Sequence, residues 1–236
     1  MTVIDINRIL GPLPYDEVAS RDPVGLVREL DRLRIDAACV VHTHALYGDP
    51  SDGNESLTQT EGSRSRLRPV PVLIPGPLGT PEWLGGARLV RLCPVEHGWS
   101  LTGEHALILT SRLARSRTAV LLGFESVTAE DVHALAGARP ELRIVLTGTG
   151  YRRMRELAEL MERHERLSVD TSTLAGHLQV EWLARRYGAH RVLFGTGAPV
   201  TDDAGPRYQL DTLDLPESGR SLIAGGNALR LLGESP

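Results

Sequence analysis

The stretch VLFGTGAP, residues 192–199, has the sequence of a buried strand that ends in a tight turn. Three large apolar residues and a glycine lead directly into Thr196, Gly197, Ala198 and Pro199. Similar apolar stretches recur along the chain, and the predicted strands are 2–6, 36–42, 68–74, 87–92, 118–123, 142–147, 167–172 and 191–196. Strands that are apolar at nearly every position are typical of parallel sheets, which are buried on both faces.

Stretches with helical periodicity separate these strands. Residues 151–164 place apolar side chains at i, i+3, i+4 and i+7, and residues 176–188 carry a similar stripe that predicts a helix ending at Gly188. Thr128 is predicted to cap a third helix, and Asn227 a short last one. Residues 43–67 are polar and are predicted to form a long loop with at most one poor helix.

Eight strands that alternate with helices within about 250 residues predict a single (β/α)8 barrel. The predicted domain is the whole chain, residues 1–236. A doubly wound open sheet is the alternative, but such a sheet usually has a glycine-rich turn after its first strand, and DINRILGPLP has none.

Composition excludes several classes of function. The net charge of −4 gives no basic footprint for nucleic acid, and no apolar run reaches the roughly 18 residues of a membrane span. All 26 basic residues are arginine, which excludes Schiff-base catalysis by lysine and a carboxylated lysine between two metals. The start of the chain does not resemble a signal peptide, and Cys39 and Cys93 are expected to be free, buried thiols, so we expect a cytoplasmic protein.

Function in such a barrel depends on residues at the carboxyl ends of the strands. The candidate catalytic residues, which could act as acid or base there, are His97, Glu125 and Asp170. The other polar residues at these ends are candidates for lining a ligand pocket, namely Asp5, Asn7, His42, His44 and Thr196. Each has a structural alternative, such as a hydrogen bond inside the barrel or an ion pair with an arginine. Asp202 and Asp203 follow the last strand and are expected to be solvated.

The order of several short stretches resembles the decarboxylase-like branch of the amidohydrolase superfamily. These stretches are IDINRILG, RLCPVEHGWSL, LSVDTS, RVLFGTGAP and IAGGNALRLL. The resemblance implies metal ligands at five positions: a His-x-His pair after the first strand, a His at the ends of strands five and six, and an Asp at the end of strand eight. In this chain those positions are Asn7, Ile9, Gly123, Gly148 and Gly197. A divalent site needs three or four converging N, O or S donors, so we expect no metal and no cofactor.

Three functions stay open. The chain is a ligand-binding, non-catalytic relative, or a metal-independent hydrolase or lyase, or a metal-dependent hydrolase or decarboxylase with rearranged ligands at His42 and His44. The expected partner is a small molecule, and the resemblance implies a homodimer, with Trp83, Trp99 and Trp182 as interface candidates. The three glycines at strand ends leave a gap, which either holds water or a small ligand or is filled by Phe124.

Overall fold

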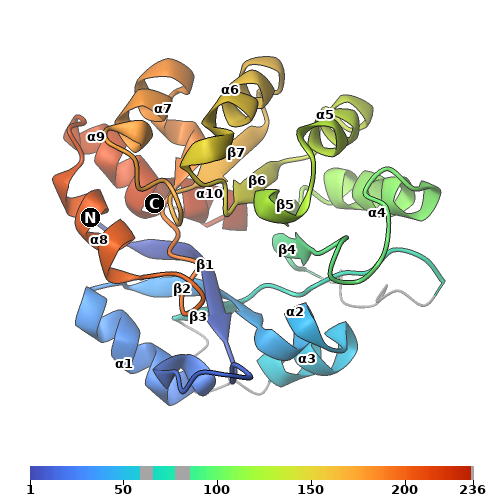
Figure 1. Ribbon diagram of the computed structural model, residues 1–236, viewed down its shortest axis with the longest axis horizontal. Helices are drawn as coiled ribbons and strands as arrows, with labels where there is room; N and C mark the ends of the chain where they lie inside the picture. The colour runs from blue at the N-terminus through green and yellow to red at the C-terminus, as the bar shows by residue number, and fades with distance from the viewer. Residues whose placement is uncertain (59–65, 78–85, 235–236) are drawn as a thin grey trace.

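The fold is described from a computed structural model, in which residues 1–58, 66–77 and 86–234 are placed (Figure 1). The strands of this part of the chain are β1 Ile4–Leu10, β2 Ala37–His42, β3 Leu67–Pro69, β4 Leu89–Leu92, β5 Ala119–Gly123, β6 Ile144–Thr147, β7 Leu167–Asp170 and β8 Val192–Leu193. Each lies within or overlaps one of the eight predicted strands.

The strands form a closed parallel barrel. Ladder hydrogen bonds join them into two parallel sheets, β1-β2-β3 and β4-β5-β6-β7-β8. A parallel bridge between Val72 and Arg91 joins the segment after β3 to β4. On the other side, the Ile6 amide donates to the Phe194 carbonyl over 2.9 Å and joins β1 to the chain that continues β8. These links confirm the predicted (β/α)8 barrel rather than an open sheet.

Helices form the outer layer around the strands (Figure 1). The longer ones are α1 Pro23–Leu33, α3 Pro50–Thr58, α4 Glu104–Arg115, α5 Ala129–Ala138, α6 Met154–Arg163, α7 Gln179–Tyr187 and α8 Ala204–Thr212, and the shorter ones are α2 Thr43–Tyr47, α9 Glu217–Ser221 and α10 Asn227–Leu232. Short 3-10 or π turns lie at Ala19–Arg21, Phe124–Ser126, Tyr151–Arg153, Ala189–Arg191 and Leu222–Gly226. No helix of the described residues is long and apolar enough to cross a membrane.

Local sequence signals explain some of the helix ends. Thr128 caps α5 as predicted, and Asp131 completes a capping box with it. Gly188 ends α7 as predicted, with φ at +94°. The prediction for Asn227 is wrong, because Asn227 is the first residue of α10 and its amide donates to the carbonyls of Ala189 and Val192.

The prediction of a long loop over 43–67 is also wrong, because α2 and α3 occupy its first part. The His42 side chain accepts the His44 amide and caps α2. The Asp49 side chain accepts the Ser51 amide over 2.7 Å at the start of α3. Asn54 of α3 then exchanges two hydrogen bonds with the Val72 backbone, of 2.8 and 2.9 Å. Polar caps therefore begin both helices, and the buried amide of Asn54 holds α3, which has few apolar residues.

The core has two layers, inside the barrel and between the barrel and its helices. The inner cluster includes Ile6, Cys39, Val72 and Leu121, and the outer one joins the other strand faces to the helices. Phe124 belongs to the outer layer and is fully buried there, so it does not fill the gap that the sequence predicts at the strand ends. Both cysteines are free and buried, as predicted.

Candidate functional site

A cavity of about 100 Å³ lies at the carboxyl ends of the strands. Its lining residues are Asn7, Ile9, Leu46, Tyr47, Arg91, Cys93, Glu96, Glu125, Gly148, Ser172, Thr173, Gly197, Val200 and Thr201. We call this cavity the barrel mouth. Four of the five positions to which the sequence resemblance assigns metal ligands line it, namely Asn7, Ile9, Gly148 and Gly197. Those positions therefore converge at one place, as the resemblance implies.

A chain of hydrogen bonds crosses the floor of the mouth. Arg91 Nη1, from β4, donates to Asn7 Oδ1 over 2.9 Å. The other end of the same amide, Asn7 Nδ2, donates to Asp170 Oδ2 of β7 over 2.9 Å. Ser172 Oγ donates to the second oxygen of Asp170, also over 2.9 Å. Asn7 thus uses both ends of its amide to join a cation on one side of the barrel to a carboxyl group on the other.

Asp170 supports the mouth from below, because it is fully buried and does not line the cavity. Burial disfavours the ionised carboxyl group and raises its pKa to about 7, while the hydrogen bonds from Asn7 and Ser172 oppose the shift. A carboxyl group with this pKa takes up or releases a proton near neutral pH, but here both of its oxygens are already engaged by protein donors.

Glu125 fills the space left by two of the strand-end glycines. A Cβ atom on Gly123 would lie 3.0 Å from Glu125 Oε1, and one on Gly148 would collide with the same carboxylate. Gly148 also has φ at +64°, a conformation that disfavours any other residue. At the third position, a Cβ on Gly197 would lie 2.7 Å from Thr201 Oγ1. The gap predicted from the sequence is thus partly filled by side chains from neighbouring loops.

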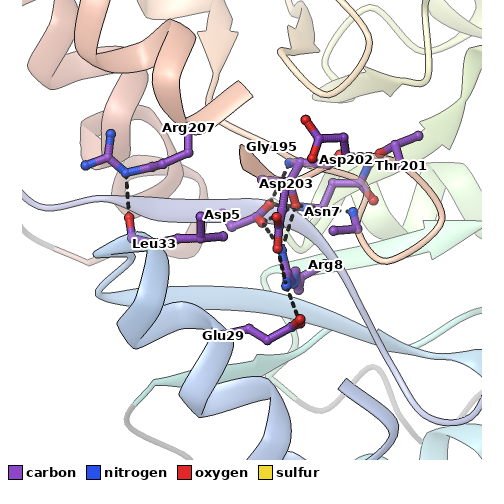
Figure 2. A network of polar contacts seen from close by, with 12 residues as sticks. Asp5, Asn7, Arg8, Glu29, Leu33, Gly195, Thr201, Asp202, Asp203 and Arg207 are labelled. Atoms are coloured by element: carbon purple, nitrogen blue, oxygen red, sulfur yellow. Dashed lines mark hydrogen bonds and ion pairs between the residues drawn. The ribbon is translucent and has the colours of Figure 1, made fainter. Parts of the chain in front are cut away.

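A second buried network lies beside the mouth and holds the turn after β8 (Figure 2). Asp5 accepts the Thr196 amide over 3.1 Å and the Thr196 hydroxyl over 2.6 Å. Arg8 donates to Thr196 Oγ1 over 3.2 Å, to Glu29 over 2.7 Å and to Asp203 over 3.1 Å. Burial raises the pKa of Asp5, and the nearby Arg8 charge opposes that shift. Neither Asp5 nor Thr196 lines the mouth, so their place in the structure is that of a buried scaffold.

The prediction that Asp203 is solvated is wrong. Its carboxylate receives hydrogen bonds from Arg8 of β1 and from Arg32 of α1, the latter over 3.0 Å. Asp203 therefore ties the segment after β8 to the first strand and the first helix of the chain.

The three predicted histidines are not among the residues that line the mouth. His42 Nδ1 accepts the His44 amide over 3.2 Å, and its pKa is lowered, mainly by burial and also by the His44 charge. The His44 ring lies beside Gly48, where a Cβ atom on Gly48 would be 2.3 Å from His44 Cδ2. His97 Nε2 lies 3.1 Å from the Ala45 carbonyl. Of the predicted site residues, the structure brings Asn7 and Glu125 together in the mouth, with Asp170 beneath them.

Within the described residues, the donors that the mouth offers to a cation include the carboxylates of Glu96 and Glu125 and the amide of Asn7. No three His, Cys, Asp or Glu side chains of this part of the chain are placed to hold a metal ion. Burial raises the pKa of the Cys93 thiol to about 11, so it stays protonated at neutral pH. Glu125 and Glu96 are the carboxylates of the lining, and the residues that line the mouth include no histidine.

Sequence reasoning missed Arg91, the cation of the mouth. Arg91 interrupts an apolar strand in ARLVRL, and a charged residue inside a buried strand was the available signal. Its Nε is buried without a hydrogen-bond partner among the described residues. Sequence reasoning also missed Arg8, which is another charged residue inside a buried strand. Arg8 follows Asn7 in β1, and the register between β1 and β2 shifts between Asp5 and Arg8.

Comparison with known proteins identifies the family. A family model described as amidohydrolase matches residues 82–233. An uncharacterised TIM-barrel protein from Bordetella bronchiseptica has a TM-score of 0.76 at 17% identity, over 99% of both chains. The 5-carboxyvanillate decarboxylase of Sphingomonas paucimobilis has a TM-score of 0.74 at 13% identity, over 99% of both chains. A mutant of the 5-carboxyvanillate decarboxylase of Novosphingobium aromaticivorans has a TM-score of 0.75 at 12% identity, over 98% of this chain and 97% of the other. That structure contains bound manganese and 3-methoxy-4-hydroxy-5-nitrobenzoic acid.

No curated protein matches the sequence. At the identities above, the solved structures establish the TIM-barrel fold alone. The family model covers more than half of the chain, and its range includes the five strands from β4 to β8 with the turn that follows β8. From that match and the barrel, the chain belongs to the amidohydrolase family.

Proposed function

We propose that this chain is an amidohydrolase-fold protein that works without a metal ion and binds a small polar molecule in the barrel mouth. The observation that carries the proposal is the Arg91–Asn7–Asp170 chain of hydrogen bonds, which occupies the floor where the resemblance implies metal ligands. A guanidinium fixed by Asn7 offers its remaining N–H groups to an acceptor on the ligand. The free, buried cysteines fit a cytoplasmic protein.

The chemistry of the lining limits the ligand. Typical ligand pockets have about 300–1,000 Å³, so a mouth of about 100 Å³ takes only a few heavy atoms. Arg91 can donate to an acceptor on the ligand, and Glu125 can accept from a donor on it, while Glu96 already accepts from Ser126 Oγ over 2.9 Å. The best fit is therefore a molecule that carries both, such as an amide or a small amino acid, rather than a simple anion.

Thermal unfolding with small probes tests this proposal. Glycine and acetamide carry both donor and acceptor groups, whereas acetate and methylammonium carry one kind each. A probe at about ten times its Kd adds about 1.4 kcal/mol of stability, which raises the Tm of a domain of this size by about 3–6 °C. We expect glycine or acetamide to do so, and Glu125→Gln to reduce the shift.

The matched control is Glu130→Gln, an exposed glutamate in the first turn of α5. It removes the same charge and should leave the shift unchanged. If no probe stabilises the protein, or if both variants reduce the shift equally, the mouth is not the binding site.

One observation favours a metal-independent enzyme as a second candidate. The pKa of about 7 at Asp170 is suited to acid–base catalysis. Asp170 is separated from the mouth by its own hydrogen bonds, so in this reading Glu125 would meet the substrate and Asp170 would exchange its proton through Ser172. Turnover of carboxylate or amide compounds by the wild type, with its loss in both Glu125→Gln and Asp170→Asn, would favour the enzyme over the binding protein.

A further inference from the structure

A second cavity lies at the opposite end of the barrel and is rich in arginine. It has a volume of about 380 Å³, within the range of ligand pockets. Its lining residues are Arg88, Ala114, Arg117, Thr118, Glu141, Arg143, Arg166, Arg230, Leu231 and Gly233. We call it the basic cavity. Five guanidinium groups face one carboxylate there, although the chain as a whole has a net charge of −4.

The register of the parallel barrel brings these arginines together. Arg88, Arg143 and Arg166 directly precede β4, β6 and β7, and Arg117 lies two residues before β5. The amino ends of parallel strands lie at the same end of a barrel. The backbone carbonyls of Arg88, Arg143 and Arg166 accept amides from the neighbouring strands over 2.8, 2.9 and 3.1 Å, so the ladder holds each one in place.

Within the described residues, these arginines lack the carboxylate partners that would neutralise them. None of the five forms an ion pair in this part of the chain, and the side-chain hydrogen bond found among them runs from Arg143 to the carbonyl of Arg117. Burial lowers the pKa of Arg143, and the charges of Arg166, Arg88 and Arg117 lower it further. Arg117 itself has φ at +57°, in the left-handed region where a glycine is usual.

This end of a barrel normally contributes stability, and like charges placed side by side oppose that role. An anion in the cavity would remove the repulsion. Guanidinium groups bind phosphate through paired hydrogen bonds, and several of them around one cavity suit a compact ligand with several charges. A concave cavity also fits a small molecule better than an extended polymer.

We propose that the basic cavity binds a small molecule that carries two or more linked phosphate groups. The phosphates would be held by the five arginines that line the cavity, Arg88, Arg117, Arg143, Arg166 and Arg230. The site is separate from the barrel mouth, so this proposal and the proposed function stand or fall independently.

Titration calorimetry with inorganic tripolyphosphate at low salt tests the proposal. The test variant is Arg88→Gln with Arg166→Gln, because these two side chains make no hydrogen bonds within the described part of the chain that their loss would break. We expect the double variant to bind at least about tenfold more weakly, as the loss of two charge-assisted contacts implies. The control is Arg28→Gln with Arg155→Gln, two exposed arginines outside the cavity, which should bind like the wild type.

Further probes separate this ligand class from others. Citrate tests whether any small polyanion is sufficient, and a single-stranded oligonucleotide tests for a polymer. Tripolyphosphate binding that is tighter than both, and that weakens as salt rises, supports the proposal. No binding, equal loss in the test and control variants, or tighter binding of citrate or the oligonucleotide would overturn it.

Discussion

Replacing Asp170 by asparagine should make the protein more stable at neutral pH. The asparagine side chain keeps an oxygen to accept from Asn7 Nδ2, and its new NH₂ group can donate to Ser172 Oγ, whose hydroxyl is free to rotate. The substitution therefore keeps the geometry of the floor and removes only the ionisation of a buried group. Most substitutions of a buried polar residue destabilise a protein, so the expected gain is a demanding test.

The size of the effect follows from the pKa of Asp170. Folding raises this pKa from 3.8 to about 7, a difference of about 3, and each step of one in pKa corresponds to about 1.36 kcal/mol. Between these two values the folded protein holds a proton that the unfolded chain has lost, so stability falls as pH rises through this range. Above pH 7 the full penalty, up to about 4 kcal/mol, is present, and Asp170→Asn removes it.

Urea unfolding at about pH 4 and pH 8 measures this difference. We expect Asp170→Asn to exceed the wild type in stability at the higher pH and not at the lower one. Asp52→Asn, an exposed aspartate of α3, is the control and should follow the wild type at both. If the wild type and Asp170→Asn depend on pH equally, Asp170 is not held protonated near neutral pH, and our account of the floor is wrong.

Three further predictions concern packing, charge and assembly. A Cβ on Gly195 would lie 2.6 Å from Asp170 Oδ2, so Gly195→Ala should destabilise the protein by about 1–3 kcal/mol. Gly137→Ala, in a helix with open space around that position, should stabilise it by up to about 1 kcal/mol. Equal effects of the two substitutions in urea unfolding would refute this. Arg8→Met removes the buried cation that three carboxylates share, those of Asp5, Glu29 and Asp203, and should cost about 3 kcal/mol in the same assay; an unchanged midpoint would refute it. We also expect a homodimer, with the 46% exposed Trp182 as an interface candidate, and light scattering at the mass of one 25.7 kDa chain would contradict it.

The barrel could be predicted from sequence because its signal repeats. Each strand is a short apolar run, and eight of them in alternation with helices leave few other folds. The stretch 43–58 could not, because α2 and α3 depend on caps from His42 and Asp49, and because Asn54 bonds to the Val72 backbone in the segment after β3. Tertiary contacts there override a polar composition. Trp83, one of the interface candidates, lies outside the described residues.

The site was predictable only in part, for a physical reason. Strand ends can be recognised from sequence, so Asn7, Glu125 and Asp170 were found. Which polar residue faces the cavity depends on the register of the strands and on the course of the loops, and neither can be read from the sequence. In the structure, His97 lies against the Ala45 carbonyl, and Asp5 and Thr196 bond to each other beside the mouth. Arg91 was overlooked because it lies inside an apolar strand rather than at its end.

Metal content is the measurement that tests the central claim most directly. The claim is that side chains of the protein itself, Arg91, Asn7 and Glu125, occupy the mouth in place of a metal centre. Protein purified without chelators should contain less than about 0.1 Mn, Fe or Zn per chain by elemental analysis. Close to one metal ion per chain, lost on replacing His42 and His44 by alanine, would contradict the claim and establish a rearranged metal site.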